Sequence, residues 1–114
     1  MSYKFMRLLI MFDLPMDNNS EKREYRIFRK YLIENGFLML QYSIYVRICT
    51  NQSMADTYMD KVNDNLPSDG NVRGLIITEK QYEKMKLFLG DKSKNERIIT
   101  DKRLIIFWGE LCIF

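Results

Sequence analysis

Apolar and polar positions change their period along the chain in a way that predicts alternating strands and helices. Residues 6–12 carry six apolar side chains in seven positions, and this run ends at Asp13. A short apolar run that ends at a turn predicts a buried strand. Residues 19–35 instead place apolar side chains at helical spacing, and Gly36 follows as a stop signal. The chain therefore begins with a buried strand followed by an amphipathic helix.

The rest of the chain repeats these two patterns. The predicted segments are extended runs at 37–41 and 43–49, a helix closed by Pro67, a strand at 72–78, a helix at 79–89, a polar loop at 90–96, and extended runs at 97–100 and 103–108. The first two runs form either one bent strand or a tight hairpin. Asn51 or Thr50 caps the second helix. Its apolar stripe comprises Ala55, Tyr58, Met59, Val62 and Leu66, and that of the third helix comprises Tyr82, Met85, Phe88 and Leu89.

This order of elements predicts an α+β fold of the ferredoxin-like type. Strand, helix, two strands, helix and strand make the βαββαβ arrangement, an antiparallel sheet with two helices on one face. We expect one domain over 1–114, with a core at about 5–78 and an extension at about 79–114 for dimer or partner contacts. The apolar end of the chain, 111–114, packs either on its own domain or on a partner. The fold alone does not define a function, because it hosts enzymes, regulatory modules and RNA-binding domains.

Composition excludes several kinds of chemistry. The chain has 114 residues, 46% of them hydrophobic, and contains no histidine. Histidine-dependent triads and acid–base pairs are therefore excluded. The glycines match no nucleotide-binding loop. Cys49 and Cys112 stand apart without metal-ligand spacing, which favours a reducing compartment. We expect a cytoplasmic protein without a secretory signal or a membrane-spanning segment.

The first helix carries a cluster of positive charges. Asn18 and Glu21 have the spacing of a capping box at its start. The cations of this helix are Lys22, Arg23, Arg26, Arg29 and Lys30. Arg26 lies three or four residues from the other four, so it is the centre of the cationic surface. Such a face can simply be solvated, but it also suits the phosphate backbone of a nucleic acid.

Asp13 is the candidate catalytic and metal-binding residue. A carboxylate at the end of a buried strand lies where binding groups often gather, although it could also merely begin the turn. Because histidine is absent, hydrolysis would rely on a carboxylate-bound metal or on a Tyr, Ser or Lys side chain with shifted acidity. Mg²⁺ is the natural metal, since it prefers oxygen ligands. The acids Asp56, Asp60 and Asp64 instead follow one helix face, which predicts a solvated surface.

Three segments resemble the CRISPR-associated endonuclease two family, the small adaptation proteins that work with the CRISPR integrase. They are MRLLIMFDLP at 6–15, YRIFRKYL at 25–32 and GFLMLQYSIY at 36–45. The strand at 71–78 and the residues after it extend the resemblance to about residue 90. The longer tail resembles the type II branch.

The resemblance implies a homodimer whose ferredoxin-like sheets pack face to face. Asp13 matches the magnesium-binding carboxylate of the family and Arg26 the helix arginine, while Gln41 and Ser43 match polar residues of its second-strand motif. Many members carry Tyr before the aspartate, so Phe12 removes a hydroxyl that we expect beside the metal. The segment 104–108 is expected to lock the dimer and meet the integrase. A single carboxylate makes a poor magnesium site, but a two-fold axis would supply a second one.

Two functions of different classes follow from the resemblance. In the first, the dimer is a scaffold that binds double-stranded protospacer DNA and joins CRISPR integrase dimers for spacer acquisition, with endonuclease activity as an addition. In the second, the protein is mainly a metal-dependent endonuclease that acts on RNA or DNA through Asp13. A third hypothesis is a ferredoxin-like regulatory domain that senses a ligand, but the sequence shows no small-molecule-binding motif.

Overall fold

The computed structural model describes residues 5–90 of the chain. Its elements are β1 (Met6–Asp13), α1 (Asn19–Glu34), β2 (Leu38–Gln41), β3 (Ile44–Cys49), α2 (Gln52–Asn63), β4 (Asn71–Thr78) and α3 (Glu79–Glu83). The predicted order of strands and helices is confirmed for these elements. The segments predicted at 97–100, 103–108 and 111–114 lie outside the described residues.

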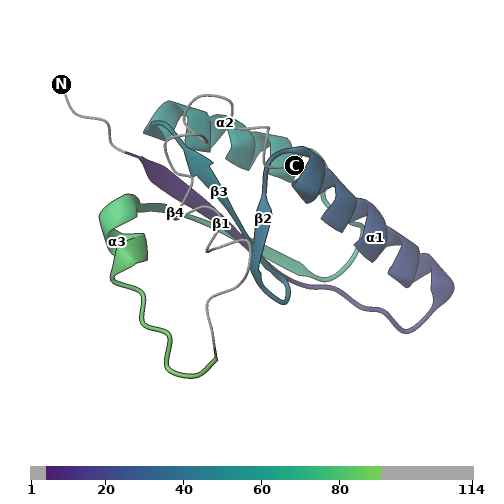
Figure 1. Cartoon of the computed structure of the whole chain (residues 1–114). Helices are drawn as coiled ribbons and strands as arrows, with labels where there is room; N and C mark the ends of the chain where they lie inside the picture. The colour runs from purple at the N-terminus through teal and green to yellow at the C-terminus, as the bar shows by residue number, and fades with distance from the viewer. Residues whose placement is uncertain (1–4, 91–114) are drawn as a thin grey trace.

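The four strands form one antiparallel sheet in the order β2-β3-β1-β4. β1 lies in the middle and pairs with β3 on one side and β4 on the other, with Leu9 opposite both Val46 and Leu75. α1 and α2 cover the same face of this sheet (Figure 1). The ferredoxin-like α+β fold is thereby confirmed. The two extended runs around residue 42 are two strands joined by a tight hairpin, rather than one bent strand.

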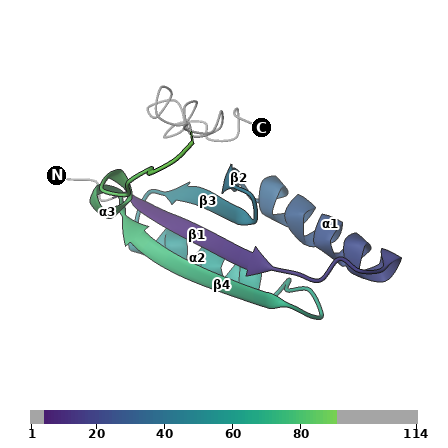
Figure 2. The same ribbon diagram turned by 90° about the horizontal axis from the view of Figure 1, so that it is seen from below.

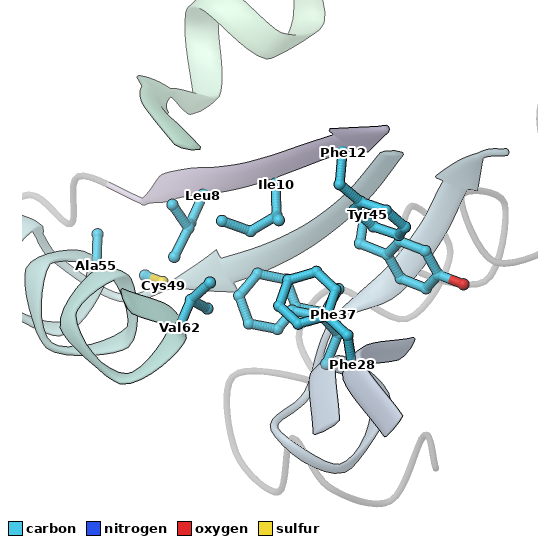
Figure 3. Close-up of a cluster of buried hydrophobic side chains, with 10 residues drawn as sticks. Leu8, Ile10, Phe12, Phe28, Phe37, Tyr45, Cys49, Ala55 and Val62 are labelled. Atoms are coloured by element: carbon cyan, nitrogen blue, oxygen red, sulfur yellow. The ribbon is translucent and has the colours of Figure 1, made fainter. Parts of the chain in front are cut away.

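The hydrophobic core fills the space between the sheet and the two long helices. Figure 3 shows Leu8, Ile10 and Phe12 pointing from β1 into this layer. They meet buried side chains from α1, from the connection between α1 and β2, from β3 and from α2, which include Phe28, Leu32, Phe37, Tyr45, Cys49, Ala55 and Val62. The alternation along β1 therefore sends its even-numbered residues into the core and its odd-numbered residues to the other face.

The ends of α1 are fixed by local hydrogen bonds. The side chain of Asn18 accepts a bond from the Glu21 amide at 2.8 Å, as a helix N-cap does. The predicted capping box is altered, because the Glu21 carboxylate accepts from the amide of Asp17 rather than from that of Asn18. At the other end Gly36 adopts φ 88° and the amide of Phe37 donates to Leu32. This pattern is a Schellman motif, which requires a residue in the left-handed region.

A buried arginine holds the end of α1 against the sheet. Arg47 of β3 is only 6% exposed and lies on the helix-covered face. Its Nε donates to the carbonyl of Asn35, and its Nη1 donates to the carbonyl of Ile48, both at 2.8 Å. Its guanidinium lies 3.8 Å from the centre of the Tyr58 ring of α2. Arg47 thus joins α1, β3 and α2 while satisfying backbone carbonyls that burial would otherwise leave unpaired.

The opposite face of the sheet, called the open face below, is also apolar. Leu9, Val46 and Tyr82 form a second buried cluster there, and Leu40, Ile44 and Ile77 pack against it. α3 contributes Tyr82, so this short helix lies on the side away from α1 and α2 (Figure 2). Arg7 pairs with Glu79 through two hydrogen bonds of 2.7 and 2.8 Å and stacks on Tyr82.

Two helical predictions were wrong at their ends. α3 stops at Glu83, so Met85, Phe88 and Leu89 do not face inwards but are 50%, 91% and 92% exposed. Leu66 lies beyond the end of α2 and is 46% exposed, so it does not belong to the apolar stripe. In both places the apolar residues keep their helical spacing in the sequence, but the backbone is no longer helical. These side chains therefore do not share one packed face with the helix before them. Asn51, rather than Thr50, caps α2.

Candidate functional site

Asp13 lies exposed at the end of β1, opposite Asn71 at the start of β4. As an odd-numbered residue it alternates to the open-face side of the sheet, like Leu9. The turn before β4 packs closely against its backbone. Gly70 has φ 100°, and a Cβ at this position would approach the Asp13 carbonyl oxygen to 2.7 Å. A glycine in the turn is therefore needed to fit the strand end that carries the carboxylate.

The hairpin between β2 and β3 lies beside the same strand end. The Phe12 amide donates to the Ser43 carbonyl at 3.0 Å. Ser43 has φ 64°, the left-handed conformation that a tight hairpin demands. Gln41 is exposed at the end of β2, where the register with β3 shifts. Gln41 and Ser43, both predicted to support the site, thus belong to one rigid turn next to Phe12 and Asp13.

Phe12 belongs to the core rather than to the surface beside Asp13. Its ring contacts those of Tyr25, Phe28 and Tyr45, with centroids 6.0, 5.2 and 5.7 Å away. A hydroxyl at this position would enter that group of rings. The expectation that Phe12 removes a hydroxyl from beside the metal is therefore wrong, because residues 12 and 13 face opposite sides of the sheet.

Two tyrosines join α1 to the hairpin. Burial and a hydrogen bond with Tyr42, together with the nearby phenols of Tyr42 and Tyr45, raise the pKa of Tyr25 to about 12, while a hydrogen bond with Ser43 opposes this rise. A phenol with such a pKa keeps its proton at neutral pH. It therefore acts as a hydrogen-bonding group and does not supply a base.

The five predicted cations of α1 are all exposed but differ in their contacts. Arg29 Nε donates to the hydroxyl of Tyr45 at 2.8 Å, so its side chain reaches toward the hairpin. Lys30 lies 3.9 Å from the Glu34 carboxylate in a solvent-exposed pair, which contributes little. Within residues 5–90, the side chains of Lys22, Arg23 and Arg26 make no hydrogen bond or ion pair. These three cations are therefore available to an external anion.

A second carboxylate ties α1 to the turn before β4. Glu24 accepts hydrogen bonds of 2.8 Å from the amide and from the hydroxyl of Ser68. These bonds, the backbone one first, lower the pKa of Glu24. Since Gly70 of the same turn packs against Asp13, Glu24 indirectly supports the strand end. The residues Leu14, Pro15, Glu21, Glu24, Tyr25, Pro67, Ser68 and Asp69 line a small hollow at this junction.

One chain alone does not offer a complete magnesium site. Over residues 5–90, no three acidic or cysteine side chains come together as metal ligands. Asp69 belongs to the turn whose Gly70 packs against the Asp13 backbone, but its carboxylate accepts from the Gly70 amide at 2.7 Å. Cys49 is buried in the core, and burial raises the pKa of its thiol, so it supplies neither a ligand nor a nucleophile. Asp56, Asp60 and Asp64 are exposed along α2, as expected of a solvated face.

Sequence patterns missed four residues of this region: Glu24, Tyr25, Tyr42 and Gly70. Glu24 and Ser68 lie 44 positions apart, so no local spacing connects them. The spacing of Tyr25 along its predicted helix indicates only a residue of the apolar face. The segment Ser68-Asp69-Gly70 predicts a turn but not its contact with Asp13. A signal was present at Tyr42, an aromatic residue between the polar residues Gln41 and Ser43 of a predicted hairpin.

The fold and the candidate site thus define a class of protein: a ferredoxin-like α+β protein with an exposed carboxylate at the end of its first strand and a cationic first helix. The family model described as CRISPR associated protein Cas2 matches residues 6–85. The chain belongs to the Cas2 family, as the resemblance indicated.

Relatives from several bacteria match over most of their length. The chain is 48% identical over 101 residues to the CRISPR-associated endoribonuclease Cas2 of Ligilactobacillus salivarius, which covers 89% of this chain and 100% of that protein. It is 46% identical over 104 residues to the protein of the same name from Campylobacter jejuni, covering 91% of this chain and 73% of that one. For the Treponema denticola protein the identity is 41% over 101 residues, with 89% and 99% covered. The expected nuclease class agrees with the names of these relatives.

Across residues 5–90, no helix combines the length and the apolar character that crossing a bilayer requires.

Proposed function

We propose that this protein is a CRISPR adaptation protein whose homodimer binds double-stranded DNA and joins CRISPR integrase dimers during spacer acquisition in the cytoplasm. The observation that carries this proposal is the exposed cationic side of α1. Lys22, Arg23 and Arg26 have no partner among the described residues, and Arg26 lies between the other two cations and Arg29 on the helix surface. Phosphate oxygens on a duplex backbone are the anions that such a stripe suits.

The open face of the sheet supports the homodimer. Leu9 and Val46 are already buried on it, but Leu75 is 50% exposed and Ile44 and Ile77 are only partly buried. A second copy that packs its own open face on these side chains would remove apolar area from water. Because Asp13 lies at the end of β1 on the same side, a two-fold axis near it would bring two carboxylates and two α1 helices into one assembly.

The scaffold proposal is tested by duplex binding of the Arg26→Ala variant over a range of salt concentrations. Each lost phosphate contact should reduce the slope of log affinity against log salt by about 0.9, and should weaken binding about fivefold near 0.15 M salt. Lys61→Ala removes the same charge from α2 and is the matched control, which should change the affinity little. Equal losses for both variants would show that only net charge matters, and this would contradict a specific role for α1.

Metal-dependent phosphodiester hydrolysis is a second candidate function, favoured by the exposed carboxylate of Asp13 and by the endoribonuclease names of the relatives. Since one chain has too few ligands, we propose that Mg²⁺ is held between the Asp13 residues of two copies. A site of this kind would need the dimer and would be lost on metal chelation.

Substitution of Asp13 separates the two functions. If the scaffold is the physiological role, Asp13→Asn should leave duplex binding and integrase-dependent spacer integration nearly unchanged, while cleavage of RNA or DNA is abolished. Asp56→Asn, an equal change on the solvated face of α2, is the control and should retain cleavage. Loss of integration by a folded, dimeric and DNA-bound Asp13→Asn protein would instead place a carboxylate-dependent step in spacer acquisition.

A further inference from the structure

Tyr42 is an exposed aromatic ring on a rigid support. It lies at the tip of the β2–β3 hairpin, and 68% of its surface is exposed. Its neighbour Ser43 adopts the left-handed conformation, with φ 64°. The carbonyl of Ser43 accepts a hydrogen bond from the Phe12 amide. The backbone of Tyr42 is therefore held next to the end of β1, while its ring is left in water.

The hairpin that carries Tyr42 contacts the cationic side of α1. Tyr42 lies close enough to Tyr25 of α1 for its phenol to raise the pKa of Tyr25, and Ser43 also acts on that group. Lys22 lies three residues before Tyr25 and Arg29 four residues after it, so both are its neighbours on the helix surface. Arg29 also reaches the hairpin directly, because its Nε donates to the Tyr45 hydroxyl at 2.8 Å. An exposed aromatic side chain and several exposed cations thus lie on two elements that contact each other.

This combination is the one that proteins use to hold unpaired nucleotides. An aromatic ring stacks on any nucleobase, because every base has a π face, while nearby cations attract the backbone phosphates. A base within a duplex is already stacked between its neighbours and does not offer its face to a side chain. The ring therefore suits an unpaired base, whereas the cations suit either kind of strand.

We propose that Tyr42 stacks on an unpaired nucleobase of a nucleic acid whose backbone phosphates contact Lys22, Arg26 and Arg29. The inference rests on the nucleic-acid binding by α1 proposed above and adds a second element to it, a base contact beside Asp13. It does not require that the strand be cleaved.

The test compares Tyr42→Ala, Tyr42→Phe and Tyr42→Leu in the full-length protein. Three fluorescent probes of equal length are titrated: single-stranded RNA, single-stranded DNA and blunt duplex DNA. Removal of the ring should weaken binding of the single-stranded probes about tenfold. The Phe variant should bind them like the wild type because it keeps the π face. The Leu variant should behave like Ala, since it retains apolar bulk without a stacking surface. Duplex affinity should stay within about twofold for all three.

Melting temperatures and dimer content, measured for each variant, establish that the fold is intact. Arg26→Ala is titrated in parallel and should weaken binding of all three probes through the lost phosphate contact. A larger effect of Tyr42→Ala on RNA than on DNA would identify RNA as the preferred source of the unpaired base, and the reverse would identify DNA.

Unchanged binding of every probe to Tyr42→Ala would overturn the inference, and the proposed function would still stand if Arg26→Ala weakens binding. A variant that loses only integrase-dependent integration, with no change in probe binding, would also overturn it and would assign the ring to a protein partner. If neither Tyr42→Ala nor Arg26→Ala changes any affinity, both the inference and the α1 proposal fail.

Discussion

Two arginines beside α1 have opposite surroundings. Arg47 of β3 lies against the C-terminal end of this helix, called the inner end here, and Arg26 lies on its exposed side, called the outer surface. At the inner end, Arg47 is buried, donates to the carbonyls of Asn35 and Ile48, and packs over Tyr58. On the outer surface, Arg26 is exposed and makes no hydrogen bond or ion pair within residues 5–90. The first guanidinium is a structural hydrogen-bond donor, while the second is a charge available to a partner. Exposure and contacts, rather than residue type, therefore identify which cations are available to an external anion.

The largest expected effect concerns the buried member of this pair. Arg47→Ala should destabilise the protein by about 3 kcal/mol, because it leaves the partly buried carbonyls of Asn35 and Ile48 unpaired and removes packing on Tyr58. Urea denaturation followed by circular dichroism measures this loss. Arg26→Ala is the matched control and should change stability by less than about 0.5 kcal/mol. Similar losses for the two variants would remove the distinction between a structural and an available arginine.

Gly36 tests how closely Arg47 packs against the C-terminal end of α1. Gly36→Ala should cost about 1–2 kcal/mol, because φ is 88° and the new Cβ would lie 3.0 Å from Arg47 Nε. Gly90 also has a positive φ, of 104°, but no atom lies within 4 Å of a Cβ built there. Gly90→Ala therefore tests the backbone conformation without the steric contact. A loss at Gly90 equal to that at Gly36, measured by the same denaturation experiment, would show that Arg47 does not constrain the glycine.

The smallest expected effect concerns Glu24, which supports the outer part of α1 through Ser68. Its pKa is lowered in the folded protein, so the ionised carboxylate contributes stability above its unfolded pKa. This contribution is lost as the pH falls through the lowered folded value. The wild type should therefore melt slightly above Glu24→Gln at pH 7, and the difference should shrink toward pH 3. Thermal melts at the two pH values test this sign, which a constant or growing difference would contradict.

Local signals were sufficient for much of the fold. Asn18 and Asn51 cap their helices, since each side chain accepts a bond from an amide three residues further on. The strand ending at Asp13 followed from its uninterrupted apolar run. Helical spacing failed after Glu83, where Phe88 continues the pattern but remains exposed. Periodicity shows which side chains would share a face, but it does not show whether a surface is present to cover them.

The surroundings of the candidate site depended on contacts between distant parts of the chain. Glu24 meets Ser68 across 44 positions, and Arg7 meets Glu79 across 72. Asp13 and Arg26 were predicted from their residue types and their place in predicted elements, and their functional roles stay predictions. The position of Tyr42 beside Tyr25 could not be predicted, because it depends on how the hairpin packs against α1.

The opposite orientations of Phe12 and Asp13 have a consequence for engineering and for evolutionary change. Phe12 is 6% exposed among aromatic rings, while the adjacent carboxylate faces water on the other side of the sheet. Substitutions at position 12 therefore act mainly on core packing, and those at position 13 act mainly on surface chemistry. Two covalently adjacent positions can thus be changed almost independently, one to alter core packing and the other to alter the charge of the surface.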